Sequence, residues 1–345
     1  MKNPAVTVIV AVFNAQDFIA DCLTSLLNQT FADFEVIVAD DCSTDSSRAV
    51  VQKFSADFNG RLKLLTLSAN SGHPGVPRNF ALEAARGKYV CFLDSDDMLS
   101  ETALEDFFNV AESFNADVVH AEKYVDFTVA GGQLQAEVVS MQTGEFVTAP
   151  TLETFDIGRR VTDFTRKRYL WWACNKLFCR QFLVDNKINF PATKTFEDFV
   201  FMFECLVTAK NYVRVPFVSY HYRAHEGSIS RRDGGLVQFF DNVIAVVKSL
   251  DDFMRGKKFF VDNPKYRYAP IDFFMRERLG NFAQETFINQ GYDPGEVYDF
   301  FCTHVFSRRP QDNVALTAYL FVAANIFKLD STRQPFASNK REVSN

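Results

Sequence analysis

The first hundred residues alternate between short apolar runs and longer amphipathic stretches. Between the runs, apolar residues recur at the three- and four-residue spacing of a helix, for example from Phe18 to Leu27. Strand and helix thus alternate four times, which predicts an α/β fold with a mostly parallel sheet flanked by helices. The runs are almost uninterrupted, as in parallel strands buried on both faces, and they cover residues 6–12, 34–39, 62–67 and 89–93.

Acidic residues follow two of the predicted strands. Asp40 and Asp41 come after the second strand, and Asp94, Asp96 and Asp97 follow the fourth. The carboxyl ends of parallel strands meet at one edge of an open sheet, where ligands bind. Neighbouring carboxylates repel one another unless a cation lies among them, and hard divalent cations prefer oxygen ligands. We therefore expect a cation and a diphosphate at this edge, with a solvated acidic turn as the alternative.

The residues after the second strand also fit a simpler interpretation, in which Ser43 or Thr44 caps the next helix. A capped turn explains Ser43, Thr44 and Asp45 well, but it explains Asp40 and Asp41 poorly. An acid at either of these two positions is suited to accept hydrogen bonds from a base edge or a ribose.

A loop rich in glycine and proline precedes the fourth strand. It runs from Asn70 to Asn79, with two glycines and two prolines, and places Arg78 at a predicted helix start. Glycine permits close approach of a backbone, and proline stiffens the loop. A guanidinium and the free amides of a helix start both favour anions, so Arg78 is a candidate phosphate ligand. A surface arginine after a long turn explains this segment equally well.

An acidic pair opens a later helix. Glu197 and Asp198 begin an amphipathic stretch, and Thr195 with Asp198 is close to a capping box. The acids therefore satisfy helix amides, or they provide a base, because a carboxylate at a helix start stays ionised and is able to take a proton from a hydroxyl.

An aromatic segment precedes this acidic pair. It contains Trp171 and Trp172, followed by Asn175 and Lys176. Together these four residues suggest a mixed apolar and polar wall that binds a sugar acceptor. The alternative is burial of both tryptophans in the core.

Composition narrows the classes of function. The 345 residues are 47% hydrophobic with a formal net charge of −6, which argues against nucleic acid as a partner. The seven cysteines form no Cys-x-x-Cys pair, which argues against zinc and fits a reducing compartment. The sequence has no Gly-x-Gly-x-x-Gly and no P-loop motif, and no glycine-rich loop follows the first strand. Dehydrogenases, P-loop enzymes and nucleotidyltransferases are therefore disfavoured.

The motifs, taken in order, resemble family 2 glycosyltransferases, which have the GT-A fold. The resemblance implies an inverting, metal-dependent enzyme that transfers a sugar from a nucleotide-sugar, commonly a UDP-sugar, with Mn²⁺ or Mg²⁺ as cofactor. It covers roughly the first hundred residues and is carried by Val6–Asn14, Val38–Asp45, Arg78–Asn79, Gly87–Tyr89 and Phe92–Asp97.

The family resemblance also implies roles for individual residues. Asp198 is the expected catalytic base and Glu197 its support, while Asp96, helped by Asp94, is the expected metal ligand. Asp41 is expected to contact the base of the nucleotide and Asp94 the ribose side. The whole expected donor site comprises Phe13, Asp40, Asp41, Arg78, Asp94, Asp97 and Arg223. No role is assigned to His221 or His225.

Two departures from the family pattern are visible. The usual Pro-Val-Tyr-Asn is replaced by Ala11-Val12-Phe13-Asn14, and the loop before Arg78 reads His73-Pro74-Gly75-Val76-Pro77. This loop resembles that of some enzymes that glycosylate teichoic polymers. The expected acceptor is accordingly a glycan, a polyol-phosphate polymer or a lipid-linked glycan. A sugar-nucleotide-binding or glycan-binding protein without activity is the non-enzyme alternative, and the intact acids argue against it.

The sequence also predicts how the chain is divided. Residues 1–230 are expected to form the catalytic domain and residues 231–345 a mainly helical region, frayed from about residue 331. Residues 126–165 are expected to be irregular. The start of the chain lacks the layout of a signal peptide and no apolar run reaches about 18 residues, which predicts a cytoplasmic protein. Peripheral contact with the inner face of the membrane and a homo-oligomer stay open for the helical region.

Overall fold

The computed structural model describes residues 3–130, 133–140, 143–225, 235–280 and 294–330. The chain forms two compact units, residues 1–233 with 253–266 and residues 234–252 with 267–345. The return of residues 253–266 to the first unit was not expected from the sequence. The predicted frayed tail from about residue 331 lies outside the described residues, and the separate functional roles of the two regions stay a prediction.

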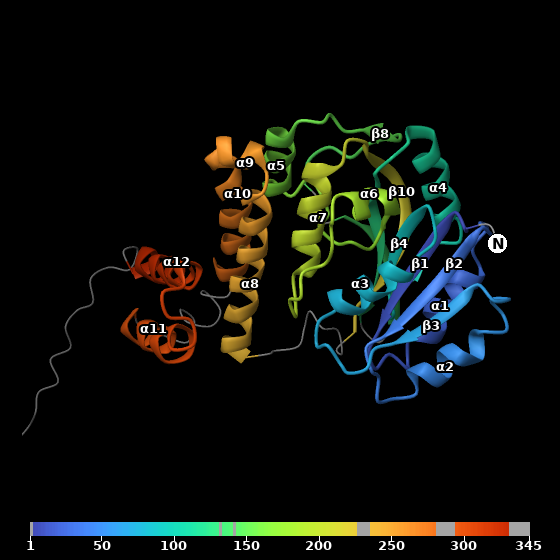
Figure 1. Ribbon diagram of the computed structural model, residues 1–345, viewed down its shortest axis with the longest axis horizontal. Helices are drawn as coiled ribbons and strands as arrows, with labels where there is room; N and C mark the ends of the chain where they lie inside the picture. Colours follow the sequence, from blue (N-terminus) through green and yellow to red (C-terminus); the bar gives the residue numbers. More distant parts are fainter. Residues whose placement is uncertain (1–2, 131–132, 141–142, 226–234, 281–293, 331–345) are drawn as a thin grey trace, which may run out of the picture. The chain divides into compact units, whose positions relative to one another are not determined.

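One sheet forms the centre of the first unit (Figure 1), in the order β3-β2-β1-β4-β9-β6-β10-β5. The pairs within β3-β2-β1-β4 are parallel, as is β6 with β10, whereas β9 is antiparallel to β4 and β6. The strands are β1 (Val6–Val12), β2 (Phe34–Asp40), β3 (Leu62–Thr66), β4 (Tyr89–Asp94), β5 (Met98–Leu99), β6 (Val118–Ala130), β7 (Gln133–Val139), β8 (Thr151–Leu152), β9 (Lys176–Cys179) and β10 (Tyr212–Arg223). The predicted α/β sheet is confirmed; it is mixed, with its parallel part in β3-β2-β1-β4 and in β6 with β10.

The register of the central strands brings the acidic strand ends together. The apolar residues of β1, β2 and β4 are buried on both faces, as their continuous apolar sequences predict. Val12 pairs with Asp40 on one side of β1, and Ala11 pairs with Asp94 on the other. The carboxylates after β2 and β4 therefore flank the end of β1.

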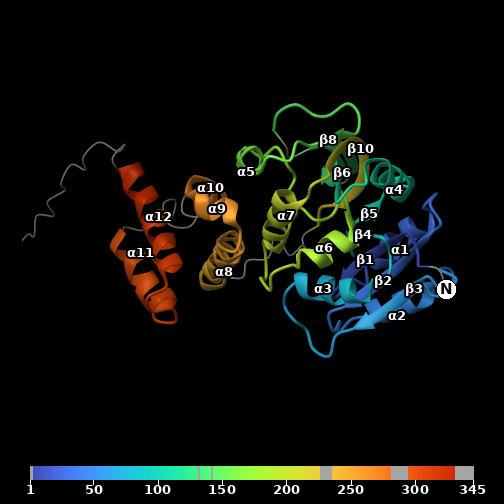
Figure 2. The same ribbon diagram turned by 45° about the horizontal axis from the view of Figure 1, so that its top comes forward.

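Helices cover both faces of this sheet. Figure 2 shows α3, α6 and α7 on one side of the strands and α1 and α4 on the other. Helix α3 packs against β1 and β2, and α4 packs against β6, β9 and β10. The helices of the first unit include α1 (Ile19–Leu27), α2 (Ser47–Phe54), α3 (Gly75–Ala84), α4 (Ala103–Phe114), α5 (Ile157–Thr165), α6 (Arg180–Asp185), α7 (Glu197–Thr208) and α9 (Lys258–Asp262).

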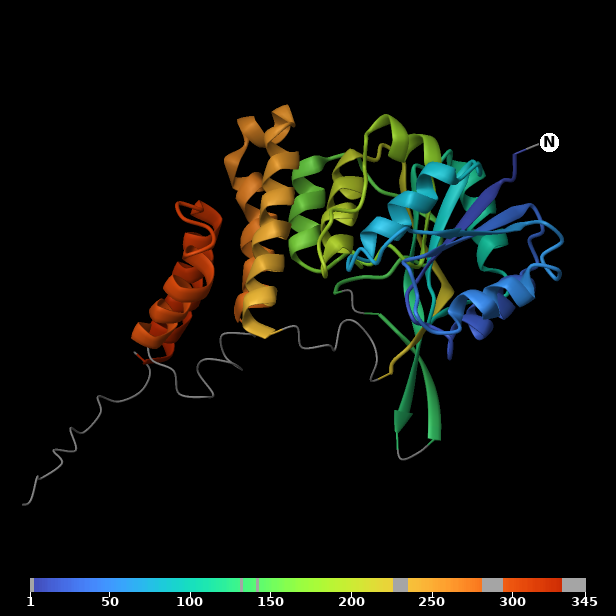
Figure 3. The ribbon, with the colours of Figure 1, turned by 60° about the horizontal axis from the view of Figure 1, so that its bottom comes forward.

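The structure corrects the expectation that residues 126–165 are irregular. β6 and β7 form an antiparallel hairpin, drawn in green in Figure 3, which extends from the sheet. β8 and α5 follow it, while the turn predicted at Gly131–Gly132 lies outside the described residues. The hairpin escaped prediction because the described side chains of β7 are mostly exposed, and an exposed strand lacks the continuous apolar run of a buried one.

The helix cap predicted at Ser43 or Thr44 is also wrong. Helix α2 begins at Ser47, whose backbone amide donates to the Asp45 carboxylate at 2.9 Å. Ser43 instead accepts a hydrogen bond from the amide of Asn14 at 3.0 Å. The two loops that follow β1 and β2 are thereby joined.

The carboxyl-terminal region is mainly helical, as predicted. It contains α8 (Gly235–Arg255), α10 (Pro264–Met275), α11 (Pro294–Phe300), α12 (Asn313–Asp330) and π-helical turns at Arg276–Gly280 and Phe301–Phe306. Phe240 packs against Phe300 and Phe301, which explains part of the phenylalanine content. Pro270 lies inside α10. Among the described residues, no helix has both the length and the hydropathy that a bilayer crossing requires.

Candidate active site

Arg78 joins carboxylates from two separate elements. Its Nη2 donates to Asp94 Oδ1 at the end of β4 at 2.7 Å. Its Nη1 donates to Glu197 Oε1 at 2.7 Å and to Asp198 Oδ1 at 3.0 Å, both at the start of α7. The guanidinium is 6% exposed, so these charge-assisted bonds form with little competition from water. The acids that follow β4 and those that open α7 therefore belong to one site.

Packing between α3 and the segment before α7 holds Arg78 in this position. Asn79 donates to the carbonyl of Phe190 at 2.8 Å and accepts from the amide of Phe190 at 3.0 Å. A Cβ added to Gly75 would lie 2.6 Å from the Cβ of Phe190, so only glycine permits this approach. The adjacent Arg78 and Asn79 thus have distinct tasks, one toward the acids and one toward the backbone.

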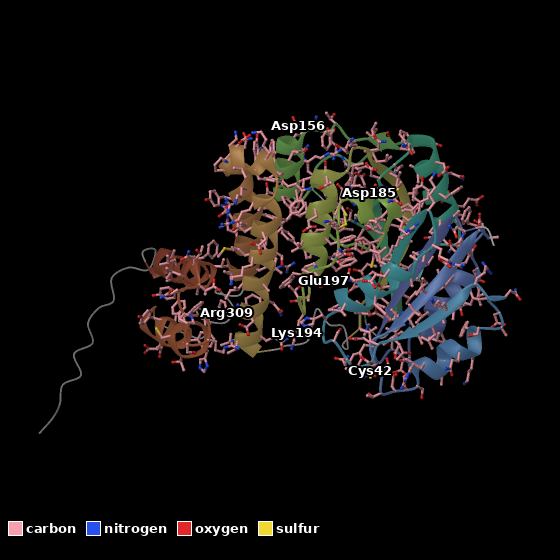
Figure 4. The ribbon with its side chains drawn as sticks, in the orientation of Figure 1. Cys42, Asp156, Asp185, Lys194, Glu197 and Arg309 are labelled. Carbon is pink, nitrogen blue, oxygen red and sulfur yellow. The ribbon has the colours of Figure 1, made fainter. Side chains whose placement is uncertain are left out.

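The carboxylate of Asp198 is fixed from two directions. Besides Arg78, it accepts a hydrogen bond from the amide of Ala173 at 3.0 Å through Oδ2. The predicted capping box is wrong, because Phe196 occupies the N-cap position in a left-handed conformation and no side chain caps α7. Glu197 and Asp198 therefore point to Arg78 rather than to the helix amides. Figure 4 labels Glu197 at this helix start.

Burial alters the acidity of both acids. The loss of water raises the pKa of Asp198; Arg78 opposes this change, and the charge of Asp94 adds to it. Burial and the neighbouring Asp198 also raise the pKa of Glu197, again against Arg78. A carboxylate with a raised pKa accepts a proton more readily than an exposed one, which suits a general base.

Asp96 and Asp97 have different surroundings, although they are adjacent. Asp96 Oδ2 lies 2.8 Å from Nε2 of His225, a residue to which the sequence gave no role. Asp97 is 2% exposed, where it accepts from the Tyr220 hydroxyl and, at 2.7 Å, from the Arg223 amide. Asp97 thus secures the end of β10, and its predicted contact with the donor stays a prediction.

The remaining predicted donor residues lie around the ends of β1 and β2. Phe13 is 40% exposed at the end of β1. Asp40 is fully buried and accepts from the Ser43 amide at 3.2 Å, so the simpler interpretation of a turn explains it after all. Asp41 accepts from the amide of Ser71 at 2.8 Å and thereby fixes the loop before α3. For Asp40 and Asp41, contact with a nucleotide stays a prediction.

Arg223 faces the opposite side of the same strand ends. Its Nη2 donates to Asp21 at 2.9 Å, and its guanidinium lies 5.6 Å from the centre of the Phe18 ring. The side chain is 23% exposed, and a role toward a diphosphate stays a prediction.

The predicted acceptor wall divides into two parts. Trp171 and Trp172 are half-buried, and Trp171 lies 5.8 Å from Phe199, the residue that follows Asp198. Asn175 and Lys176 are fully buried, which corrects their predicted place on an acceptor surface. Both instead hold the loop of residues 171–176 in place, because Lys176 Nζ donates to the Trp172 carbonyl at 2.6 Å and to Asn175 Oδ1 at 2.9 Å.

His225 and Ser71 are the residues that sequence reasoning missed. His225 lies 129 positions after its partner Asp96, and Ser71 lies 30 positions after Asp41. Neither stands in a local motif that marks it, so only the sheet topology brings them to these acids.

The sheet and its flanking helices have the architecture of the GT-A fold. Residues 7–173 match the sequence model of the family described as Glycosyl transferase family 2. The resemblance to this family that the sequence motifs indicated is confirmed over this region.

Several characterised proteins are similar to this chain. It is 29% identical over 232 residues to the poly(ribitol-phosphate) beta-glucosyltransferase of Bacillus spizizenii, a match that covers 66% of this chain and 33% of that protein. It is 30% identical over 237 residues to the putative glycosyltransferase EpsH of Bacillus subtilis, covering 67% and 64% of the two chains. The chain thus spans a third to two thirds of the length of these relatives.

The fold also matches a solved structure. Residues 1–349 of S. aureus TarS, crystallised in complex with UDP-GlcNAc, align with a TM-score of 0.69 and 23% identity. The alignment covers 96% of this chain and 93% of that one. The expected GT-A sheet with a helical carboxyl-terminal region is therefore confirmed.

Proposed function

We propose that this protein is an inverting glycosyltransferase that moves a sugar from a UDP-sugar to a hydroxyl of a polyol-phosphate polymer of the cell envelope. The observation that carries the proposal is the Arg78 junction, where the donor-side acid Asp94 and the candidate base Asp198 share one guanidinium. The names of two similar proteins support these substrates. One is a poly(ribitol-phosphate) beta-glucosyltransferase, and the other, TarS, was crystallised with UDP-GlcNAc.

The residues present fit a divalent cation. Asp96 offers carboxylate oxygens and His225 an imidazole, and burial together with the Asp94 charge raises the pKa of Asp96, a cost that a bound cation would remove. Among the described residues, no three acidic, histidine or cysteine side chains are grouped as a complete site. Mg²⁺ and Mn²⁺ suit such a partial site, because one or two protein ligands and the oxygens of a bound diphosphate complete the coordination.

In the proposed reaction, Asp198 removes the proton from the acceptor hydroxyl, which attacks the sugar from the face opposite the leaving UDP. Arg78 keeps Asp198 oriented and limits the rise of its pKa, and Glu197 helps to hold Arg78. A bound Mn²⁺ or Mg²⁺ would neutralise charge on the diphosphate. The backbone amide of Arg223 binds Asp97, the neighbour of Asp96. The guanidinium of Arg223 is therefore proposed to contact the departing phosphate.

The acceptor enters, in this proposal, beside Trp171 and Trp172. Both rings are half-buried, and that of Trp171 packs against Phe199, one residue after the proposed base. The proposed location is the cytoplasm, where UDP-sugars are made. Peripheral membrane contact and a homo-oligomer stay predictions for the helical region.

Asp198→Asn tests the base. Asparagine keeps one of the two acceptor oxygens that Arg78 and the Ala173 amide use and takes no proton, so transfer should fall about 100-fold or more, while UDP binding stays within about 2-fold. A panel of UDP-sugars with poly(ribitol phosphate), with and without Mn²⁺, measures both transfer and hydrolysis. Asp185→Asn on α6 is the matched control.

Three outcomes separate the alternatives. Near-normal turnover by Asp198→Asn contradicts the base assignment. Binding of UDP-sugars by the wild type without transfer or hydrolysis indicates a binding protein. Transfer of a nucleotidyl group from a nucleoside triphosphate indicates a nucleotidyltransferase.

A further inference from the structure

A concentration of positive charge lies beside the candidate acceptor loop. Residues 156–168 carry five basic and two acidic side chains, a net charge of +3 in a chain whose total is −6. Arg160 is buried and binds backbone carbonyls, among them that of Leu206 at 2.9 Å. The other four basic residues form what is here named the cationic face: Arg159, Arg166, Lys167 and Arg168.

A single carboxylate organises this face. Asp163 Oδ2 lies 3.5 Å from Arg159 and Asp163 Oδ1 lies 3.4 Å from Arg168. The side chain of Asp163 is 10% exposed, whereas those of Arg159 and Arg168 are 61% and 43% exposed. One acid therefore holds two guanidinium groups at the surface. Each guanidinium has five N–H donors, so both retain donors for a further anion.

Aromatic packing connects the cationic face to the candidate base. Phe164 of α5 lies 5.0 Å from Phe199 of α7, and Trp171 packs against the same ring at 5.8 Å. Phe199 directly follows Asp198. The helix α5, which carries Arg159 and precedes the other three residues of the face, therefore packs against the helix that carries Asp198; Figure 4 labels Asp156 at the start of α5.

The chain itself sets the distance between the face and the base. Arg168 precedes Ala173, whose amide binds Asp198, by five residues. Five residues span at most about 18 Å. A polymer with one hydroxyl at Asp198 would therefore reach the cationic face within a few repeating units, after passing Trp171 and Trp172.

We propose that the cationic face binds the acceptor as a polyanion, with arginines that hold phosphodiester groups of the chain while a hydroxyl of a nearby unit lies at Asp198. This inference rests on the proposed function and adds the surface that selects a phosphate-linked acceptor over a neutral glycan. Arginine suits this task because its planar fork matches phosphate oxygens. A membrane is the less favoured partner, because the cationic face lies only five residues before Ala173, whose amide binds Asp198.

Arg166→Gln with Arg168→Gln tests the face in the full-length protein. The apparent KM for poly(ribitol phosphate) should rise about 3- to 10-fold, since each exposed ion pair contributes modestly, and its dependence on salt should weaken. The kcat at saturating polymer, UDP binding and hydrolysis of the UDP-sugar should stay unchanged. Lys53→Gln with Lys63→Gln, on α2 and β3, removes the same charge elsewhere and should leave the KM unaltered.

Further arms separate this inference from the proposed function. If the double variant unfolds at a lower temperature than the wild type, Arg166→Gln alone is tested in its place. This single change leaves both ion pairs of Asp163 intact. Binding of the polymer is also measured directly, with dextran as the neutral chain and anionic lipid vesicles as the membrane. An equal KM in the double variant and its control overturns the inference, as does loss of vesicle binding with polymer binding intact. Neither result touches the proposed function, which fails instead if the wild type neither hydrolyses nor transfers any UDP-sugar.

Discussion

At the scale of single residues, Arg78 has the largest share in the candidate site. The sequence predicts it as a phosphate ligand, which stays a prediction, and in the structure its guanidinium binds Asp94, Glu197 and Asp198. A local motif shows which residue types are present. It does not show that the carboxylates of Glu197 and Asp198 on α7, more than a hundred positions later, bind the guanidinium.

Arg78→Lys should separate geometry from charge. Lysine keeps the positive charge but lacks the planar fork, so it is unable to hold carboxylates of β4 and α7 together. We expect kcat/KM to fall about 10-fold or more and the protein to lose about 1–3 kcal/mol of stability from the weakened buried bonds. Steady-state kinetics and thermal unfolding measure the two effects.

Arg86→Lys is the matched control, because Arg86 also pairs with a carboxylate, that of Glu35. That pair involves the loop before β4, at the opposite end of the sheet from the strand-end acids. It should leave kcat/KM within about 2-fold. Wild-type kinetics in Arg78→Lys would contradict the positioning role of the guanidinium.

At the scale of elements, the buried strands were predictable and the supporting loops were not. β1, β2 and β4 follow from uninterrupted apolar runs, because strands buried on both faces need them. The hairpin of β6 and β7 and the loop 171–176 lack such a pattern. Trp171 and Trp172 marked this loop in the sequence, and their contact with an acceptor stays a prediction. Asn175 and Lys176 are polar residue types, yet both are fully buried.

Lys176 is the unusual member of that loop. Burial lowers its pKa to about 7, partly opposed by Asp198. A neutral amine has two N–H donors, which match its two acceptors, the Trp172 carbonyl and Asn175 Oδ1. The loop whose Ala173 amide binds Asp198 is therefore held by a lysine that loses its charge near neutral pH.

Lys176→Met should reveal this pKa through stability. The folded-state pKa lies below the unfolded value of about 10.4, so between these values the unfolded chain binds more protons and stability rises with pH. The unfolding free energy of the wild type, relative to Lys176→Met, should increase by about 1–2 kcal/mol from pH 7 to pH 8.5.

Urea unfolding across this pH range measures the difference. Subtracting the variant removes the contributions of other titrating groups that both proteins share. Lys210→Met, at an exposed position, should show no such trend. A wild-type-minus-variant difference that stays constant with pH would show that Lys176 is not perturbed.

At the scale of the whole molecule, the residues of the candidate site come from the first compact unit alone. Asp41, Asp96, Arg78 and Asp198 lie within residues 1–233. The fold class and the helical nature of the carboxyl-terminal region were predictable from periodicity and composition. The function of the second unit was not, because helices rich in phenylalanine satisfy many packing roles without a distinctive motif.

Hydrogen exchange tests whether donor binding is confined to the first unit. UDP with Mn²⁺ should slow amide exchange in residues 38–45 and 92–97, because a ligand that binds only the folded site suppresses local opening. Residues 313–330 should exchange at the same rate with and without the donor. Protection of comparable size in α12 would show that the second unit takes part in donor binding.

Carboxylates from two elements share the guanidinium of Arg78, and this limits how the protein can be re-engineered. Chimeras between relatives are a common route to new acceptors, with the breakpoint placed where one functional module ends. Here the end of β4 and the start of α7, the proposed donor and base segments, both bind Arg78, so the proposed function predicts that they are not separable modules. A viable graft has to take positions 78, 94, 197 and 198 from the same parent, whatever else is exchanged.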